Sequence, residues 1–138
     1  MDGYHSDMTR TLTVGDVTAE RQDLLALVTE AEALGVAAVA AGVDARAVDE
    51  TCRRHIAAAG WADAFTHGTG HGVGLVIHEA PWVNATSTDV LRRGAVVTVE
   101  PGVYRGPLGG ARVEDAVLVT REGCRPLTKT PKDLPCPR

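Results

Sequence analysis

The chain has 138 residues, of which 44% are hydrophobic and 23% are charged, as is typical of one globular domain. Its formal net charge of -4 disfavours a nucleic-acid partner, because such proteins carry a basic surface. The longest weakly polar stretch, residues 34–43, is too short to span a bilayer, so we expect no membrane partner.

The three cysteines, Cys52, Cys124 and Cys136, are odd in number and include no CxxC pair. This pattern disfavours a disulfide framework or a zinc knuckle and favours a reducing compartment. The first residues contain no apolar run of the kind that a signal peptide needs. We therefore expect a cytoplasmic protein.

The first half of the chain predicts one strand followed by two helices. Alternation and β-branched residues favour a strand over residues 8–14. Helical periodicity then covers residues 19–41 and 45–59, with Thr18 and Asp44 as expected N-caps and a glycine closing each helix. The apolar stripe of the first helix consists of Leu24, Leu27, Val28, Ala31 and Leu34.

The second half predicts strands and loops. Residues 65–81 are rich in glycine and read as loop and strand, whereas residues 95–100 and 111–120 are clear strand candidates. The tail, residues 121–138, is polar and rich in proline, and we expect it to run over the surface. This order predicts an α+β fold with helices on one face of a mostly antiparallel sheet.

Three histidines, His67, His71 and His78, lie within twelve residues and are separated by glycines. Imidazole is the commonest metal ligand. Any one of them alone would be an ordinary loop histidine, but three together favour a site. The glycines disfavour the helix that an HExxH zinc motif requires, and the segment matches neither phosphate-loop pattern.

Carboxylates accompany the predicted strands. Glu100 ends one strand, and Glu114 shares a face of the next strand with Arg112 and apolar neighbours. A carboxylate placed there needs a cationic partner if it is buried, either Arg112 or a metal ion; if that face is solvated, Glu114 is a surface charge. Asp7 lies on the polar face of the first strand, which is a weak indication by itself. These residue types suit a divalent ion such as manganese or cobalt, so the pattern indicates a carboxylate–histidine metal site.

Four segments carry a family resemblance. In order, they read GYHSDMTRT, HGTGHGVGLVIHEAP, VVTVEPGVY and GARVEDAVLVT. Together they resemble the signature blocks of the M24-type metallopeptidases, which include Xaa-Pro aminopeptidase, prolidase and methionine aminopeptidase. The SDxTRT segment, the histidine that opens HGTGH and the arginine two places before the last glutamate are similar to the proline-directed branch.

The resemblance implies a pita-bread fold and two divalent metal ions, with Mn2+ expected first and Co2+ or Zn2+ as alternatives. It implies four metal ligands and three accompanying residues. The ligands are Asp7, His71, Glu100 and Glu114. Glu100 would also move a proton to the leaving nitrogen, His67 and His78 would hold the scissile carbonyl, and Arg112 would orient Glu114 and lower its proton affinity.

The same resemblance implies a fifth ligand, an aspartate on a strand that would precede Met1. We therefore expect residues 1–138 to be a partial catalytic domain, without the amino-terminal part of the fold. The implied substrates are short peptides containing proline, cut by an Xaa-Pro aminopeptidase or an Xaa-Pro dipeptidase, and a homodimer is possible. The alternative is an inactive remnant or a protein-interaction module of the same fold; retention of all four ligands favours descent from a peptidase.

Overall fold

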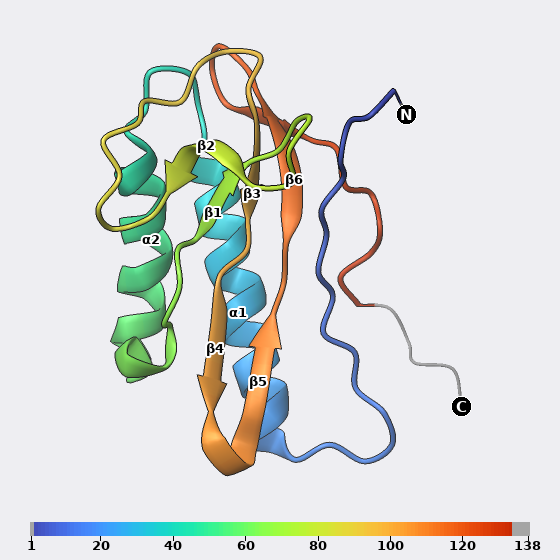
Figure 1. Ribbon diagram of the computed structural model, residues 1–138. Coiled ribbons are helices and arrows are strands. Elements are labelled where there is room, and N and C mark those ends of the chain that lie inside the picture. Colours follow the sequence, from blue (N-terminus) through green and yellow to red (C-terminus); the bar gives the residue numbers. More distant parts are fainter. Residues whose placement is uncertain (1, 134–138) are drawn as a thin grey trace.

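The computed structural model describes residues 2–133, which form two helices and seven strands (Figure 1). The helices are α1 (Ala19–Ala38) and α2 (Ala45–Ala58). The strands are β1 (Gly70–Gly72), β2 (Glu79–Val83), β3 (Val96–Val99), β4 (Gly102–Arg105), β5 (Gly109–Arg112), β6 (Asp115–Val119) and β7 (Cys124–Pro126). Two short 3-10 turns, Ala62–Ala64 and Gly106–Leu108, complete the described elements.

The strands form a five-stranded sheet in the order β2-β1-β3-β6-β7 and a two-stranded sheet of β4 and β5. Every pairing between these strands is antiparallel. The register of β3 with β6 continues unchanged into that of β4 with β5, because Val99 pairs with Asp115 and Gly102 pairs with Arg112. The two sheets are therefore one long hairpin that is interrupted near its middle, and the predicted α+β class is confirmed.

Both helices pack together on one side of the strands (Figure 1). Alternate valines of β3 and β6 point into this layer, and Val97, Val99, Val117 and Val119 are all fully buried or nearly so. Gly35 of α1 allows the close approach, since a Cβ built there would lie 2.6 Å from the Cys52 sulfur and 2.7 Å from Val99. Leu24, Val28 and Ala31 of the predicted stripe belong to this core, but Leu34 is exposed and Leu27 lies outside it, so that part of the prediction is wrong.

Helix boundaries follow the sequence closely at their starts. Thr18 and Asp44 occupy the expected N-cap positions, although neither side chain makes a capping hydrogen bond. The first helix ends at Ala38 instead of residue 41, and Val39 takes the C-cap position. Gly42 thus lies beyond the helix end.

The predicted strand over residues 8–14 is wrong, because only Thr9 pairs there, in an isolated bridge with Glu114. The segment is extended beside residues 112–114, but the Thr11 hydroxyl, and not its backbone, bonds to the backbone of Arg112. The single strand predicted over residues 111–120 is also divided, with Val113 and Glu114 between β5 and β6. A side-chain hydrogen bond of Thr11 replaces pairing at the first place, and at the second the Glu114 N–H donates to the Thr9 carbonyl instead of to a sheet partner.

The tail does lie mostly at the surface as far as residue 133, but it contributes β7 to the sheet edge. Cys52 and Cys124 are free thiols, and Cys136 falls outside the described residues. Within residues 2–133, no helix combines the length and apolar character that crossing a membrane requires.

Candidate metal centre

Two glutamates lie at the interruption of the long hairpin. The constant register places Glu100 opposite Glu114, each just past a strand end. Their backbone amides bond to other segments: the Glu100 N–H donates to the Thr69 carbonyl at 2.7 Å, and the Glu114 N–H donates to the Thr9 carbonyl at 3.1 Å. The break in the ladder thus brings the histidine-rich loop and the amino-terminal segment to the two carboxylates.

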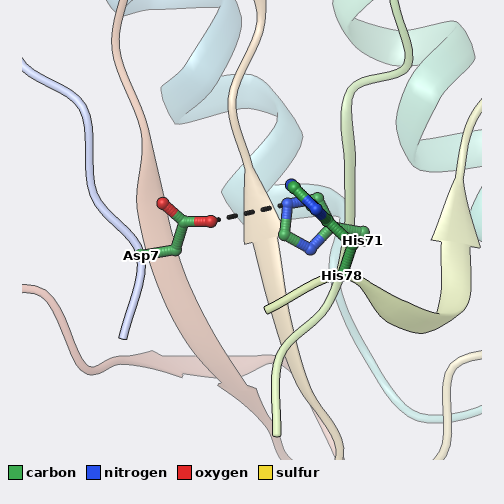
Figure 2. A group of neighbouring side chains, drawn as sticks. All are labelled: Asp7, His71 and His78. Carbon is green, nitrogen blue, oxygen red and sulfur yellow. Dashed lines mark ion pairs between the residues drawn. The ribbon is translucent and has the colours of Figure 1, made fainter. Parts of the chain in front are cut away.

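His71 lies at the centre of the cluster. Its Nε2 is 3.1 Å from Glu100 Oε1 and 3.6 Å from Asp7 Oδ2, and Figure 2 shows the Asp7 carboxylate directed at its ring. Ligand atoms of His71, Glu100 and Glu114 lie within 4.8 Å of one another, as do those of Asp7, His71 and His78. The four side chains expected as ligands therefore fall into two neighbouring groups that share His71, with Glu100 and Glu114 in one and Asp7 in the other.

The backbone around His71 is fixed by close packing against β3. A Cβ built on Gly70 would lie 2.0 Å from the Thr98 carbonyl oxygen, so only glycine fits there. The His71 N–H donates to the Thr98 hydroxyl at 3.0 Å, and that hydroxyl donates to Glu100 at 3.2 Å. Thr98 thus links the histidine to the glutamate beside it.

Glu114 is the most constrained member of the set. It is 1% exposed, and its Oε2 accepts a 2.5 Å hydrogen bond from the Thr9 hydroxyl. Its other oxygen, Oε1, has no partner among the described residues. Burial, together with the charges of Glu100 and Asp7, raises the pKa of Glu114 to about 7 against the opposing Thr9 hydrogen bond. A carboxylate with an unpartnered buried oxygen and acidic neighbours is what a bound cation would satisfy.

The other two charged centres stabilise each other. Burial alone would lower the pKa of His71, but its hydrogen bonds to Glu100 and to the Gly72 carbonyl raise it above its ordinary value. Burial would raise the pKa of Glu100, but the His71 hydrogen bond and charge hold it below its usual range. The His71–Glu100 contact thus favours the protonated imidazole together with the ionised carboxylate.

Arg112 reaches Glu114 only through a third residue. Its Nε donates to the Thr9 hydroxyl at 3.0 Å and lies 4.0 Å from Glu100 Oε2. Its charge lowers the pKa of Glu114, but burial outweighs that effect. Arg112 is thus placed to hold Thr9 against Glu114.

The remaining two histidines differ in position. His78 is exposed, and its ring centroid is 4.3 Å from that of His71 (Figure 2). His67 belongs to neither of the ion-binding groups found in residues 2–133. It packs edge-on against Phe65 with centroids 5.2 Å apart, and its buried Nε2 has no hydrogen-bond partner.

Sequence reasoning missed the residues that donate hydrogen bonds to the candidate ligands and their backbone. Thr9 and Thr98 bond to carboxylates of the site. Arg10 donates to the Glu114 carbonyl at 2.6 Å and to the Asp115 carboxylate at 2.7 Å. Two signals were available: alternation places Thr98 on the same strand face as Glu100, and Thr9 and Arg10 belong to the SDxTRT segment that carries the family resemblance.

Known proteins resemble both the sequence and the fold. A model described as metallopeptidase family M24 matches residues 1–121. Xaa-Pro dipeptidase of Pyrococcus horikoshii is 41% identical over 131 residues, which make up 95% of this chain and 37% of that protein.

Two solved structures extend the comparison. Xaa-Pro dipeptidase from Bacillus anthracis is 44% identical with a TM-score of 0.94, covering 96% of this chain and 38% of that one. X-Pro aminopeptidase from Thermotoga maritima is 32% identical with a TM-score of 0.92, again covering 96% and 38%. This chain therefore has part of a pita-bread fold and spans less than two fifths of the length of these relatives. It belongs to metallopeptidase family M24, in which it stands with proteins named Xaa-Pro dipeptidase or prolidase.

Proposed function

We propose that this chain is part of the catalytic domain of a metal-dependent exopeptidase that cuts peptide bonds next to proline. The carrying observation is that His71 lies in one group with Glu100 and Glu114 and in a second with Asp7, and that a buried Glu114 oxygen has no partner among the described residues. The family and the names of its relatives support the substrate class. Xaa-Pro dipeptides are the first substrates to test.

The donor set fits divalent metal ions. Three carboxylates and one imidazole offer mostly hard oxygen ligands, which favours Mn2+, with Co2+ or Zn2+ as alternatives. Two ions held by such a set supply Lewis acidity and lower the pKa of water. The like-charged pair of glutamates supports this assignment, since opposed carboxylates without a cation are unfavourable.

The chain's own residues would then have distinct tasks. The Glu100 carboxylate, kept ionised by His71, accepts a proton from the attacking water and passes it to the leaving nitrogen. His78, exposed beside His71, faces the substrate and donates to the scissile carbonyl. We assign His67 the same purpose, which requires its ring to move, because its Nε2 is buried and the ring packs against Phe65 and Tyr104. Arg112 keeps Thr9 and, through it, Glu114 in place.

The test is hydrolysis of an Xaa-Pro dipeptide by the purified chain with added Mn2+. A tripeptide with proline second is the matched substrate that separates dipeptidase from aminopeptidase action. Any Mn2+-dependent turnover that this partial domain supports should fall by at least about a hundredfold in Glu100→Gln. Equal rates for both proteins would remove the catalytic proposal.

The alternative is a module that retains metal affinity without turnover. Calorimetric titration with Mn2+ separates the two. Binding without hydrolysis of either peptide would favour the module, whereas binding and turnover that are lost together in a Glu114→Gln variant would favour the peptidase.

A further inference from the structure

One turn of α2 holds the loop that carries two of the histidines. We infer that Asp49 and Arg53 are a positioning pair, which sets the place of loop 65–71 and, through Thr69, of Glu100. The inference rests on the proposed function, because the loop matters as part of the candidate metal centre. The contacts that support it are separate from those of the metal centre. Neither residue belongs to the four signature segments.

Asp49 is a buried charge committed to this loop. The residue is 1% exposed, which for a carboxylate is unfavourable unless its oxygens are satisfied. Its Oδ1 accepts hydrogen bonds from both the backbone N–H of Thr69 at 3.0 Å and the Thr69 hydroxyl at 2.8 Å. Its Oδ2 accepts from Arg53 Nε at 2.6 Å. The carboxylate therefore connects the helix to the loop at one residue.

Arg53 binds the start of the same loop through hydrogen bonds. Its guanidinium donates to the carbonyl of Phe65 at 3.1 Å and to the carbonyl of His67, and it lies over the Phe65 ring at 4.3 Å from the centroid. Since Asp49 and Arg53 are four residues apart on a helix, they share one face and act as a unit. Together they fix both ends of the segment between Phe65 and Thr69.

The connection continues to the candidate metal centre. The Thr69 carbonyl accepts the 2.7 Å hydrogen bond from the Glu100 backbone N–H. Thr69 thus donates two hydrogen bonds to Asp49, from its N–H and its hydroxyl, and accepts one from Glu100 at its carbonyl. His71 follows two residues later and meets Glu100 at 3.1 Å. A displaced Thr69 would move a carboxylate and an imidazole of the cluster apart.

The experiment compares Asp49→Asn with Glu50→Gln in the full chain. Both variants remove one carboxylate charge from adjacent positions of α2, but Glu50 is exposed. An asparagine can accept from Thr69, yet its amide then faces Arg53, donor against donor. We expect Asp49→Asn to weaken Mn2+ binding, measured by calorimetry, about tenfold to a hundredfold. Glu50→Gln should bind Mn2+ as the unchanged chain does.

A second measurement uses the metal-free protein and distinguishes positioning from loss of stability. Amide hydrogen exchange is followed at Glu100 and at Val119, whose N–H bonds to the Ala95 carbonyl within the core sheet. A positioning role predicts faster exchange at Glu100, with Val119 unchanged. If Asp49→Asn does not fold, Arg53→Met takes its place, because the Arg53 side chain is 32% exposed and its stem is retained.

The inference is overturned if exchange at Glu100 stays unchanged, if Glu100 and Val119 accelerate equally, or if Mn2+ affinity is retained despite faster exchange at Glu100. If the unchanged chain binds no Mn2+ at all, the proposed function fails, and exchange at Glu100 alone decides whether Asp49 and Arg53 position it.

Discussion

The hydroxyl of Thr9 is the only hydrogen-bond donor to the Glu114 carboxylate among the described residues, so Thr9→Val removes that hydrogen bond, together with the acceptor of Arg112 Nε. A hydrogen bond to a charged group contributes about 1.5–3 kcal/mol, and about 1.4 kcal/mol corresponds to one pKa unit. The pKa of Glu114, already raised to about 7 by burial, should therefore rise by about one to two units in the variant.

Metal affinity reports this change, because an ion binds the ionised carboxylate in competition with the proton. At pH 7 about half of the Glu114 carboxyls are ionised in the unchanged chain, and about a tenth to a hundredth would be in Thr9→Val, so Mn2+ affinity should fall about five- to fiftyfold. At pH 9 the difference should shrink to about twofold or less, since Glu114 is then almost fully ionised in the unchanged chain and at least about half ionised in the variant.

The assay is calorimetric titration with Mn2+ at pH 7 and pH 9. Thr11→Val is the matched control, because Thr11 bonds only to the backbone of Arg112 and to no carboxylate. A loss of affinity that is equal at the two pH values, or equal in the two variants, would refute the reasoning.

Two further variants test the core. Lys132→Met leaves the fully buried Glu32 without its cation. A buried pair broken in this way costs about 3–5 kcal/mol, but the Lys132 side chain is itself 30% exposed. We therefore expect a smaller loss of about 2–3 kcal/mol in unfolding free energy at pH 8. Burial raises the pKa of Glu32 to about 7, although the Lys132 ion pair opposes this shift. The loss of unfolding free energy should therefore be smaller at pH 5, where Glu32 is protonated. Urea unfolding at both pH values checks this expectation, and an equal loss at the two values would contradict it. Gly35→Ala should lower the melting temperature despite alanine's better helix propensity, since its Cβ would meet the Cys52 sulfur at 2.6 Å, and a higher melting temperature in calorimetry would disprove that packing.

The helices could be predicted because their apolar stripes recur over many turns, and the structure starts both at the expected residues. The strands were harder, since residues 111–120 are rich in β-branched residues and read as one strand although the ladder breaks at Val113 and Glu114. The consecutive acids Glu114 and Asp115 interrupt the alternation there, but they do not show that the pairing stops. The break comes from Thr9 taking the Glu114 amide hydrogen bond across more than one hundred residues.

For the site, the residue pattern alone indicated carboxylates and histidines as candidates. It did not predict that their side chains lie close together in the fold. The meeting of Glu100 and Glu114 depends on strand register, and a shift of one residue would turn either side chain to the opposite face. The family resemblance supplied the set, and its members' roles as ligands remain predictions. Asp49 gave no signal, because aspartate on a helix is common in solvated positions, and Thr9 belonged to a signature segment that did not reveal its role.

The opposed glutamates imply a conflict between stability and metal binding. Because the folded-state pKa of Glu114 is raised from 4.5 to about 7, the metal-free fold binds more protons than the unfolded chain between these values, and its stability falls as pH rises through that window. Glu114→Gln removes this dependence while keeping an acceptor for Thr9. From pH 5 to pH 8 the metal-free variant should therefore gain about 2 kcal/mol over the unchanged chain, yet bind Mn2+ at least about tenfold more weakly. Urea unfolding with exposed Glu122→Gln as control measures the first effect. If the unfolding free energies of the unchanged chain and Glu114→Gln change with pH in parallel, Glu114 does not destabilise the metal-free fold when it is ionised.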